Sequence, residues 1–126
     1  MEVYTLSLRA KAQALKYGLR LIDISPAGET CFAPNPTHLA ALRSSQMSPA
    51  LFADRYYADM RKRFSEDPTP WMTVLHSPQT VGLVCDCANG GTCHRAYLLD
   101  IFRKISLYYA IPFAYKGEFG ANRHAA

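Results

Sequence analysis

Three of the four cysteines in this chain stand close together, and a histidine and an arginine follow them directly. The stretch "VCDCANGGTCHR" contains Cys85, Cys87, Cys93, His94 and Arg95. Thiols and imidazoles bind metals or take part in catalysis, and a guanidinium holds anions. A glycine-rich loop that opens a helix also leaves backbone N–H groups free to bind an anion. The residue types therefore predict a polar site around this stretch.

Two functional interpretations of the cluster compete. In the first, the three cysteines and His94 bind zinc or iron, but their spacing is not that of a standard zinc knuckle. Adjacent residues such as Cys93 and His94 also rarely converge on one ion, which disfavours a metal site. In the second, Cys87 or Cys93 is a nucleophile in a nest of backbone amides, with Arg95 as the anion clamp and His94 handling the proton. The loop "CANGGT" fits the C-x-x-G-x-T pattern of rhodanese-like sulfurtransferases, whereas the phosphatase pattern C-x5-R fails.

A third interpretation is purely structural. Cysteines are often small buried residues, Arg95 would pair with Asp23 or Asp86, and His94 would be a core histidine. Packing alone gives no reason for a Cys-His-Arg triplet at a glycine-rich helix start, so the cluster as a whole favours a functional site. The spacing permits enzymatic activity without demonstrating it.

Alternating strands and helices must position this cluster. The patterns predict strands over residues 3–8, 19–25, 80–87 and 111–115. They predict helices over 9–18, 36–44, 49–64, 69–77 and 92–109. Asn35 and Ser48, each followed by proline, are typical N-terminal caps. We therefore expect one α/β domain over residues 1–126, three-layered and Rossmann-like, with a mostly parallel sheet between helices and a frayed tail from about residue 118.

Parallel sheets bind ligands beyond the carboxyl ends of their strands. One predicted strand ends near Asp23 and another near Cys85 and Cys87, so neighbouring strands would bring these residues into one crevice. His94 continues an apolar helix stripe, and we expect its ring to face inward. The expected site combines the cluster with Asp23, with the loop residues Asn89, Gly90, Gly91 and Thr92, and with the hydroxyl of Tyr56 or Tyr57.

Composition limits the class of protein. The chain has 126 residues, of which 49% are apolar and 12% aromatic, which excludes a disordered chain. A net charge of +4 suits an anionic small molecule or nucleic acid as partner but is too small to indicate nucleic acid by itself. No signal peptide or run of about 20 apolar residues stands out. We therefore expect a soluble cytoplasmic protein with reduced cysteines and no membrane partner. No cofactor and no oligomeric state are indicated.

The segment "VGLVCDCANGGTCHRAYLLDIF" resembles the signature of the uncharacterised family called domain of unknown function 488. "LRLIDIS", "FAPNPTHLAAL" and "FADRYYADMRKRF" are similar to further segments of that family, so the resemblance covers about residues 3–105. It implies an α/β fold and a polar pocket at the strand ends, but no established activity. The characteristic positions it implies are Asp23, Tyr56 or Tyr57, Cys85, Cys93, His94 and Arg95. The family commonly places an arginine soon after its aspartate, whereas Ile24 and Ser25 follow Asp23 here.

The leading hypothesis is a site for an anionic nucleotide or phosphate-like group at the strand ends, with one thiolate that acts or ligates. The alternative is a non-catalytic module that binds nucleic acid or protein. In that case the cysteine cluster is structural, and Arg55 with the run Arg61–Arg63 forms the contact face.

Overall fold

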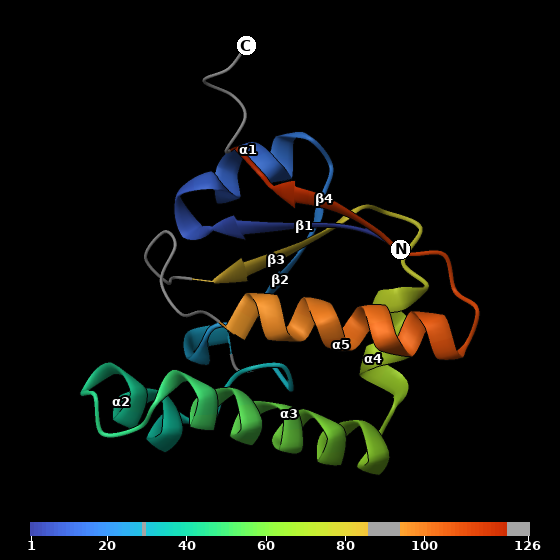
Figure 1. Ribbon diagram of the computed structural model, residues 1–126. Coiled ribbons are helices and arrows are strands. Elements are labelled where there is room, and N and C mark those ends of the chain that lie inside the picture. The colour runs from blue at the N-terminus through green and yellow to red at the C-terminus, as the bar shows by residue number, and fades with distance from the viewer. Residues whose placement is uncertain (29, 86–93, 121–126) are drawn as a thin grey trace.

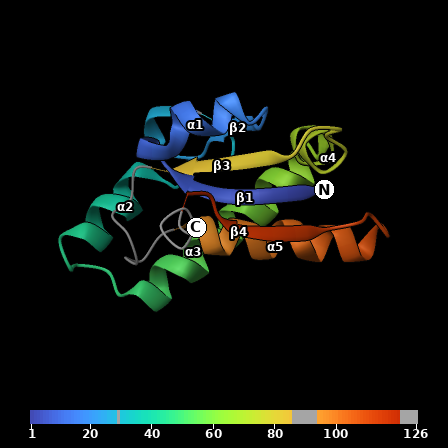
Figure 2. The ribbon, with the colours of Figure 1, turned by 90° about the horizontal axis from the view of Figure 1, so that it is seen from above.

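A parallel sheet organises the chain, whose computed structural model describes residues 1–28, 30–85 and 94–120. Within these residues the strands are β1 (Glu2–Ser7), β2 (Arg20–Asp23), β3 (Val81–Cys85) and β4 (Ala114–Glu118), in the order β2-β3-β1-β4. Every pairing is parallel, and β1 lies between β3 and β4 (Figure 2). The predicted α/β fold is therefore confirmed, and the carboxyl ends of the strands meet at one edge.

Helices cover both faces of the sheet. A 3-10 turn, η1 (Leu8–Ala10), leads into α1 (Lys11–Lys16) on one face (Figure 1). The opposite face carries α3 (Pro49–Glu66), α4 (Thr69–Leu75) and α5 (His94–Tyr108), while a second 3-10 turn, η2 (Pro26–Gly28), and α2 (Pro36–Arg43) precede α3. No helix of the described part of the chain combines the length and apolarity that crossing a membrane requires.

The two N-terminal caps form as their sequences predict. The side chain of Asn35 accepts hydrogen bonds from the backbone N–H groups of Thr37 and His38, and that of Ser48 accepts from Leu51. Such caps satisfy N–H groups that have no partner inside the helix, and each stabilises its helix by about 1 kcal/mol. They fix where α2 and α3 begin.

The hydrophobic clusters on the two faces of the sheet differ in size. On the α3/α5 face, Leu83 and Cys85 pack with Leu98 and Phe102 of α5, all fully buried. The α1 face is shallower, and Gly82 of β3 has no room for a side chain there. A Cβ at that position would lie 2.8 Å from a Leu6 methyl carbon. The larger cluster therefore lies between the sheet and the helix that begins at His94.

The C-terminal part of the chain departs from the predicted boundaries. The last strand runs over 114–118, not 111–115. Residue 111 is still bonded to the end of α5, because the backbone N–H of Ile111 donates to the carbonyl oxygen of Ser106, and Ala110 before it has a φ of 56°. Glu118 closes β4, and the backbone N–H of Phe119 donates to the carbonyl oxygen of Thr5, while the frayed tail itself stays a prediction. Residues 121–126 lie outside the described residues.

Candidate functional site at the carboxyl edge of the sheet

Two adjacent strands end at the carboxyl edge, and the helices that follow them lie on opposite faces of the sheet. Ser7 at the end of β1 is the register partner of Cys85 at the end of β3. The chain continues from β1 into α1 on one face, and from β3 it continues toward α5 on the other (Figure 1). In α/β sheets, ligands bind outside the carboxyl ends of the strands at a switch point of this kind.

His94 anchors the start of α5 to the end of β2. Its side chain is buried, and Nε2 lies 2.6 Å from the carbonyl oxygen of Ile24. A carbonyl oxygen only accepts hydrogen bonds, so Nε2 carries the proton. The ring also contacts that of Tyr56, with centroids 5.4 Å apart. The prediction that His94 faces inward is confirmed, and this nitrogen positions the helix.

Arg95 forms an ion pair that the sequence did not indicate. Its Nη1 lies 3.0 Å from Oε2 of Glu118 in β4, with the two side chains 12% and 35% exposed. The other carboxylate oxygen of Glu118 accepts from Oγ1 of Thr5 at 2.7 Å, and Thr5 also bonds to the Tyr115 hydroxyl. A threonine within the apolar strand "VYTLSL" was the sequence signal for this polar group. If the cysteine cluster is purely structural, the expected partner of Arg95 is Asp23 or Asp86. Asp86 lies outside the described residues.

Asp23 and Cys85 share the carboxyl edge but not a face of the sheet. Asp23 is the register partner of Val84, which packs on the α1 face, whereas Cys85 packs on the α3/α5 face. Side chains alternate along a strand and match across it, so Asp23 and Cys85 point to opposite faces. The expectation of one crevice that Asp23 shares with the whole cluster stays a prediction, because Cys87 and Cys93 lie outside the described residues.

The carboxylate of Asp23 shapes the loop that follows β2. Its Oδ1 accepts from the backbone N–H of Ser25 at 2.9 Å and from the Ser25 hydroxyl at 2.6 Å. Gly28 lies so close that a Cβ there would stand 2.7 Å from Cγ of Asp23. These contacts give Asp23 a structural role beside the edge.

The two candidate tyrosines take different positions. Tyr56 is buried beside His94, and its hydroxyl donates to the carbonyl oxygen of Phe32 at 2.8 Å. Tyr57 lies between α3 and α5 and donates to Asp100 at 3.1 Å. Burial, with the Asp100 carboxylate beside it, raises the pKa of Tyr57 to about 12. The structure thus brings Tyr56, but not Tyr57, to the group around His94.

The two described cysteines are buried or half-buried. Cys85 is fully buried. Burial raises the pKa of the Cys31 thiol, although the nearby Arg63 guanidinium acts in the opposite direction. The predicted site residues Cys87, Asn89, Gly90, Gly91, Thr92 and Cys93 lie outside the described residues. Within the described residues, no three His, Cys, Asp or Glu side chains gather closely enough to hold a metal.

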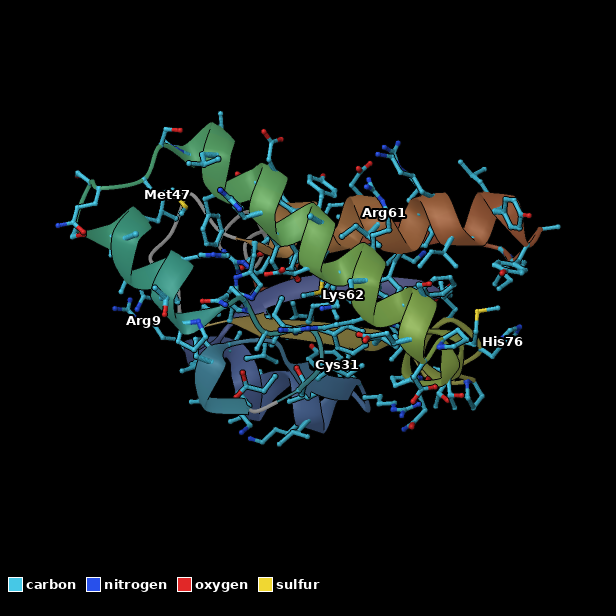
Figure 3. The ribbon with its side chains drawn as sticks, turned by 90° about the horizontal axis from the view of Figure 1, so that it is seen from below. Arg9, Cys31, Met47, Arg61, Lys62 and His76 are labelled. Carbon is cyan, nitrogen blue, oxygen red and sulfur yellow. The ribbon has the colours of Figure 1, made fainter. Side chains whose placement is uncertain are left out.

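Three successive backbone carbonyls of one loop are held by α3, which the sequence did not predict. Nη1 of Arg63 donates to the carbonyl oxygens of Cys31 at 2.6 Å and Ala33 at 2.9 Å, and Tyr56 holds Phe32 between them. Figure 3 views this side of the molecule and labels Cys31 below α3. Arg63 is therefore not part of a solvated cationic face, because its guanidinium satisfies loop carbonyls.

Comparisons with known proteins do not identify the chain. No protein-family model, no curated protein and no solved structure matches it. The resemblance to domain of unknown function 488 therefore stays a prediction.

Proposed function

We propose that this protein binds an anionic, nucleotide- or phosphate-like group beyond the carboxyl ends of β1 and β3. The observation that carries the proposal is the switch point at this edge. The adjacent strands β1 and β3 end there at Ser7 and Cys85, and the helices that follow them lie on opposite faces of the sheet. The helix that begins at this edge, α5, is 15 residues long. The N-terminus of such a helix carries about half a positive charge, which favours an anion.

Arg95 supplies the side-chain cation of the proposed site. Its guanidinium is mostly buried and fixed by Glu118, so little side-chain entropy is lost when an anion binds. Glu118 also offsets part of the positive charge, so the bound group must compete with this carboxylate. In the proposal, the amides of residues 89–92 complete the anion site, and His94 sets the position of the helix that carries Arg95.

Thiol chemistry remains part of the proposal at Cys87 or Cys93. Cys85 is fully buried, so it is assigned a packing role. A cysteine at a helix start and beside an arginine is favoured as the thiolate, which is the nucleophilic form. Cys93 stands directly before His94, the first residue of α5, and two positions before Arg95.

The test is a titration of the protein with inorganic phosphate and with AMP, in which isothermal calorimetry measures the affinity. Arg95→Gln should weaken binding of both probes by about tenfold, because a charge-assisted contact is worth about 1.5 kcal/mol or more. Arg55→Gln makes the same charge change on an exposed part of α3 and should leave the affinity unchanged. Unchanged affinity in Arg95→Gln, with its circular dichroism spectrum intact, would overturn the proposal.

We infer a second candidate function, a non-catalytic module that contacts nucleic acid through α3. The observation in its favour is that Arg55, Arg61 and Lys62 are all exposed on this helix, while Arg63 is not available. The triple variant with glutamate at these three positions should then abolish binding of a short single-stranded RNA. Arg95→Gln should leave that binding intact. Equal RNA binding by the triple variant and the unaltered protein would exclude this face.

We further propose that the chain is a relative of the domain of unknown function 488 family. The support is the Cys-His-Arg triplet at the start of α5, following a strand that ends in cysteine. A reactivity measurement tests the thiol chemistry proposed at Cys87 or Cys93. If Cys87 and Cys93 react with iodoacetamide no faster than a free cysteine at neutral pH, the nucleophile version of the proposal fails.

A further inference from the structure

A groove between α3 and α5 lies away from the carboxyl edge. Its volume is about 170 Å³, and it is lined from α3 by Met60, Arg61 and Phe64 and from α5 by Ile101 and Ile105. Figure 3 views α3 and α5 from below and labels Arg61 between them. The two isoleucines lie about 9 and 15 Å along α5 from Arg95, at 1.5 Å per residue. The groove is therefore separate from the proposed anion site.

The floor of the groove is apolar and firmly packed. Met60 is fully buried, and Phe64, Ile101 and Ile105 are half-buried against the main core. A cavity of about 150 Å³ lined by apolar side chains holds one benzene molecule. By that measure the groove accommodates a single aromatic ring.

The rim of the groove is cationic. Lys104, 67% exposed at its side chain, is held by Asp100 at 2.9 Å, and its ammonium nitrogen lies 5.5 Å from the ring centroid of Tyr57. Asp100 also accepts from Arg103 at 2.6 Å and from Tyr57, so three donors use its carboxylate. Arg61 is exposed and has no acidic partner within the described residues. Arg103 and Lys104 thus share one carboxylate, and the exposed Arg61 adds a further positive charge from α3, so the rim favours an anion.

We propose that this groove binds a small arylcarboxylate, with its ring on the apolar floor and its carboxylate between Arg61 and Lys104. An apolar floor with charged groups only at its edge is the usual composition of a small-molecule site. Arg61 is free to form a bidentate contact with a carboxylate, and Lys104 is already held at the rim. Neither residue takes part in the site proposed at the carboxyl edge.

Three phenyl compounds that differ in charge test the proposal on the ¹⁵N-labelled protein. Phenylacetate, neutral phenylacetamide and cationic phenethylamine are titrated, and backbone amide shifts are recorded by NMR. Phenylacetate should shift amides around Phe64 and Ile101 and bind most tightly, while phenethylamine should bind most weakly. The double variant Arg61→Gln, Lys104→Gln should weaken phenylacetate about tenfold and leave phenylacetamide unchanged, because only the charged contacts are lost.

Two further variants sharpen the test. Arg55→Gln removes an exposed arginine of α3 that does not line the groove and should leave phenylacetate binding unchanged. Ile105→Phe fills the groove and should abolish binding of the acid and the amide alike. The proposal is overturned if phenylacetate shifts no amides of the groove at about 10 mM, which marks very weak binding. It is equally overturned if phenethylamine binds as tightly as phenylacetate, or if Ile105→Phe, folded, still binds the acid.

Discussion

Glu118 decides how much positive charge Arg95 presents to an anion. The substitution Glu118→Gln removes the carboxylate charge and keeps an oxygen that can accept the hydrogen bond of Thr5. We expect opposite effects on stability and on anion binding. The folded protein should become less stable, and its affinity for inorganic phosphate should rise.

The size of both effects follows from the exposure of the ion pair. Arg95 and Glu118 meet at 3.0 Å with side chains 12% and 35% exposed. Exposed pairs contribute about 0–1 kcal/mol, and the partial burial of Arg95 sets this pair at the upper end. The free energy of unfolding should therefore fall by about 1 kcal/mol, which lowers the melting temperature by about 3–5 °C. The same energy released to a competing phosphate corresponds to about fivefold tighter binding.

Two measurements on one variant check this reasoning. Calorimetric titration with phosphate gives the affinity, and thermal unfolding followed by circular dichroism gives the stability. Glu66→Gln, an exposed residue at the end of α3, makes the same charge change far along the chain and should alter neither quantity. If Glu118→Gln loses stability without gaining phosphate affinity, Arg95 is not the cation of an anion site.

Three further predictions concern buried and half-buried side chains. Tyr56→Phe should lower the free energy of unfolding in urea by about 1–3 kcal/mol, because the buried Phe32 carbonyl loses its donor. The pKa of Tyr57 is raised from 10.0 to about 12, so the stability that its hydroxyl contributes is complete below pH 10 and is lost as the pH rises toward 12. In Tyr57→Phe, the free energy of unfolding in urea should therefore fall less over this pH window. Cys85 should resist iodoacetamide until the protein unfolds, and Cys31 should react slowly at neutral pH because burial raises its pKa.

Matched controls make these predictions refutable. Tyr108, 82% exposed, gives the control Tyr108→Phe, which should leave stability unchanged. Equal losses in Tyr56→Phe and Tyr108→Phe would contradict the role of the Phe32 carbonyl. Identical loss of stability above pH 10 with and without Tyr57 would assign the pH dependence to other groups. Mass spectrometry that finds Cys85 alkylated in the folded protein would contradict its burial.

Local signals in the sequence predicted local structure well. Asn35 and Ser48 define helix starts because capping needs only a side-chain oxygen and N–H groups two or three residues away. The inward position of His94 followed from its place in the apolar stripe of α5. These predictions required no knowledge of where distant elements lie.

Contacts between distant elements were not predictable in the same way. Glu118 meets Arg95 only because β4 pairs with β1 in a register interrupted by an irregularity after Val3, which no residue pattern specifies. Arg63 resembles any exposed arginine of a polar helix face until the loop carbonyls are placed beneath it. The opposite faces of Asp23 and Cys85 depend on the register of β2 with β3, and a one-residue slip would reverse that result.

The central position of β1 has a consequence for the order in which the protein folds. Val3 pairs with Val81 on one side and Tyr115 on the other, so β1 is synthesised long before either neighbour. A sheet that depends on such distant pairings folds slowly, since large loops must close before any ladder forms. Until β3 leaves the ribosome, the apolar segment "VYTLSL" has no partner strand and is exposed to aggregation. We therefore expect the nascent chain to be most prone to aggregation before the strand that ends at Cys85 is complete.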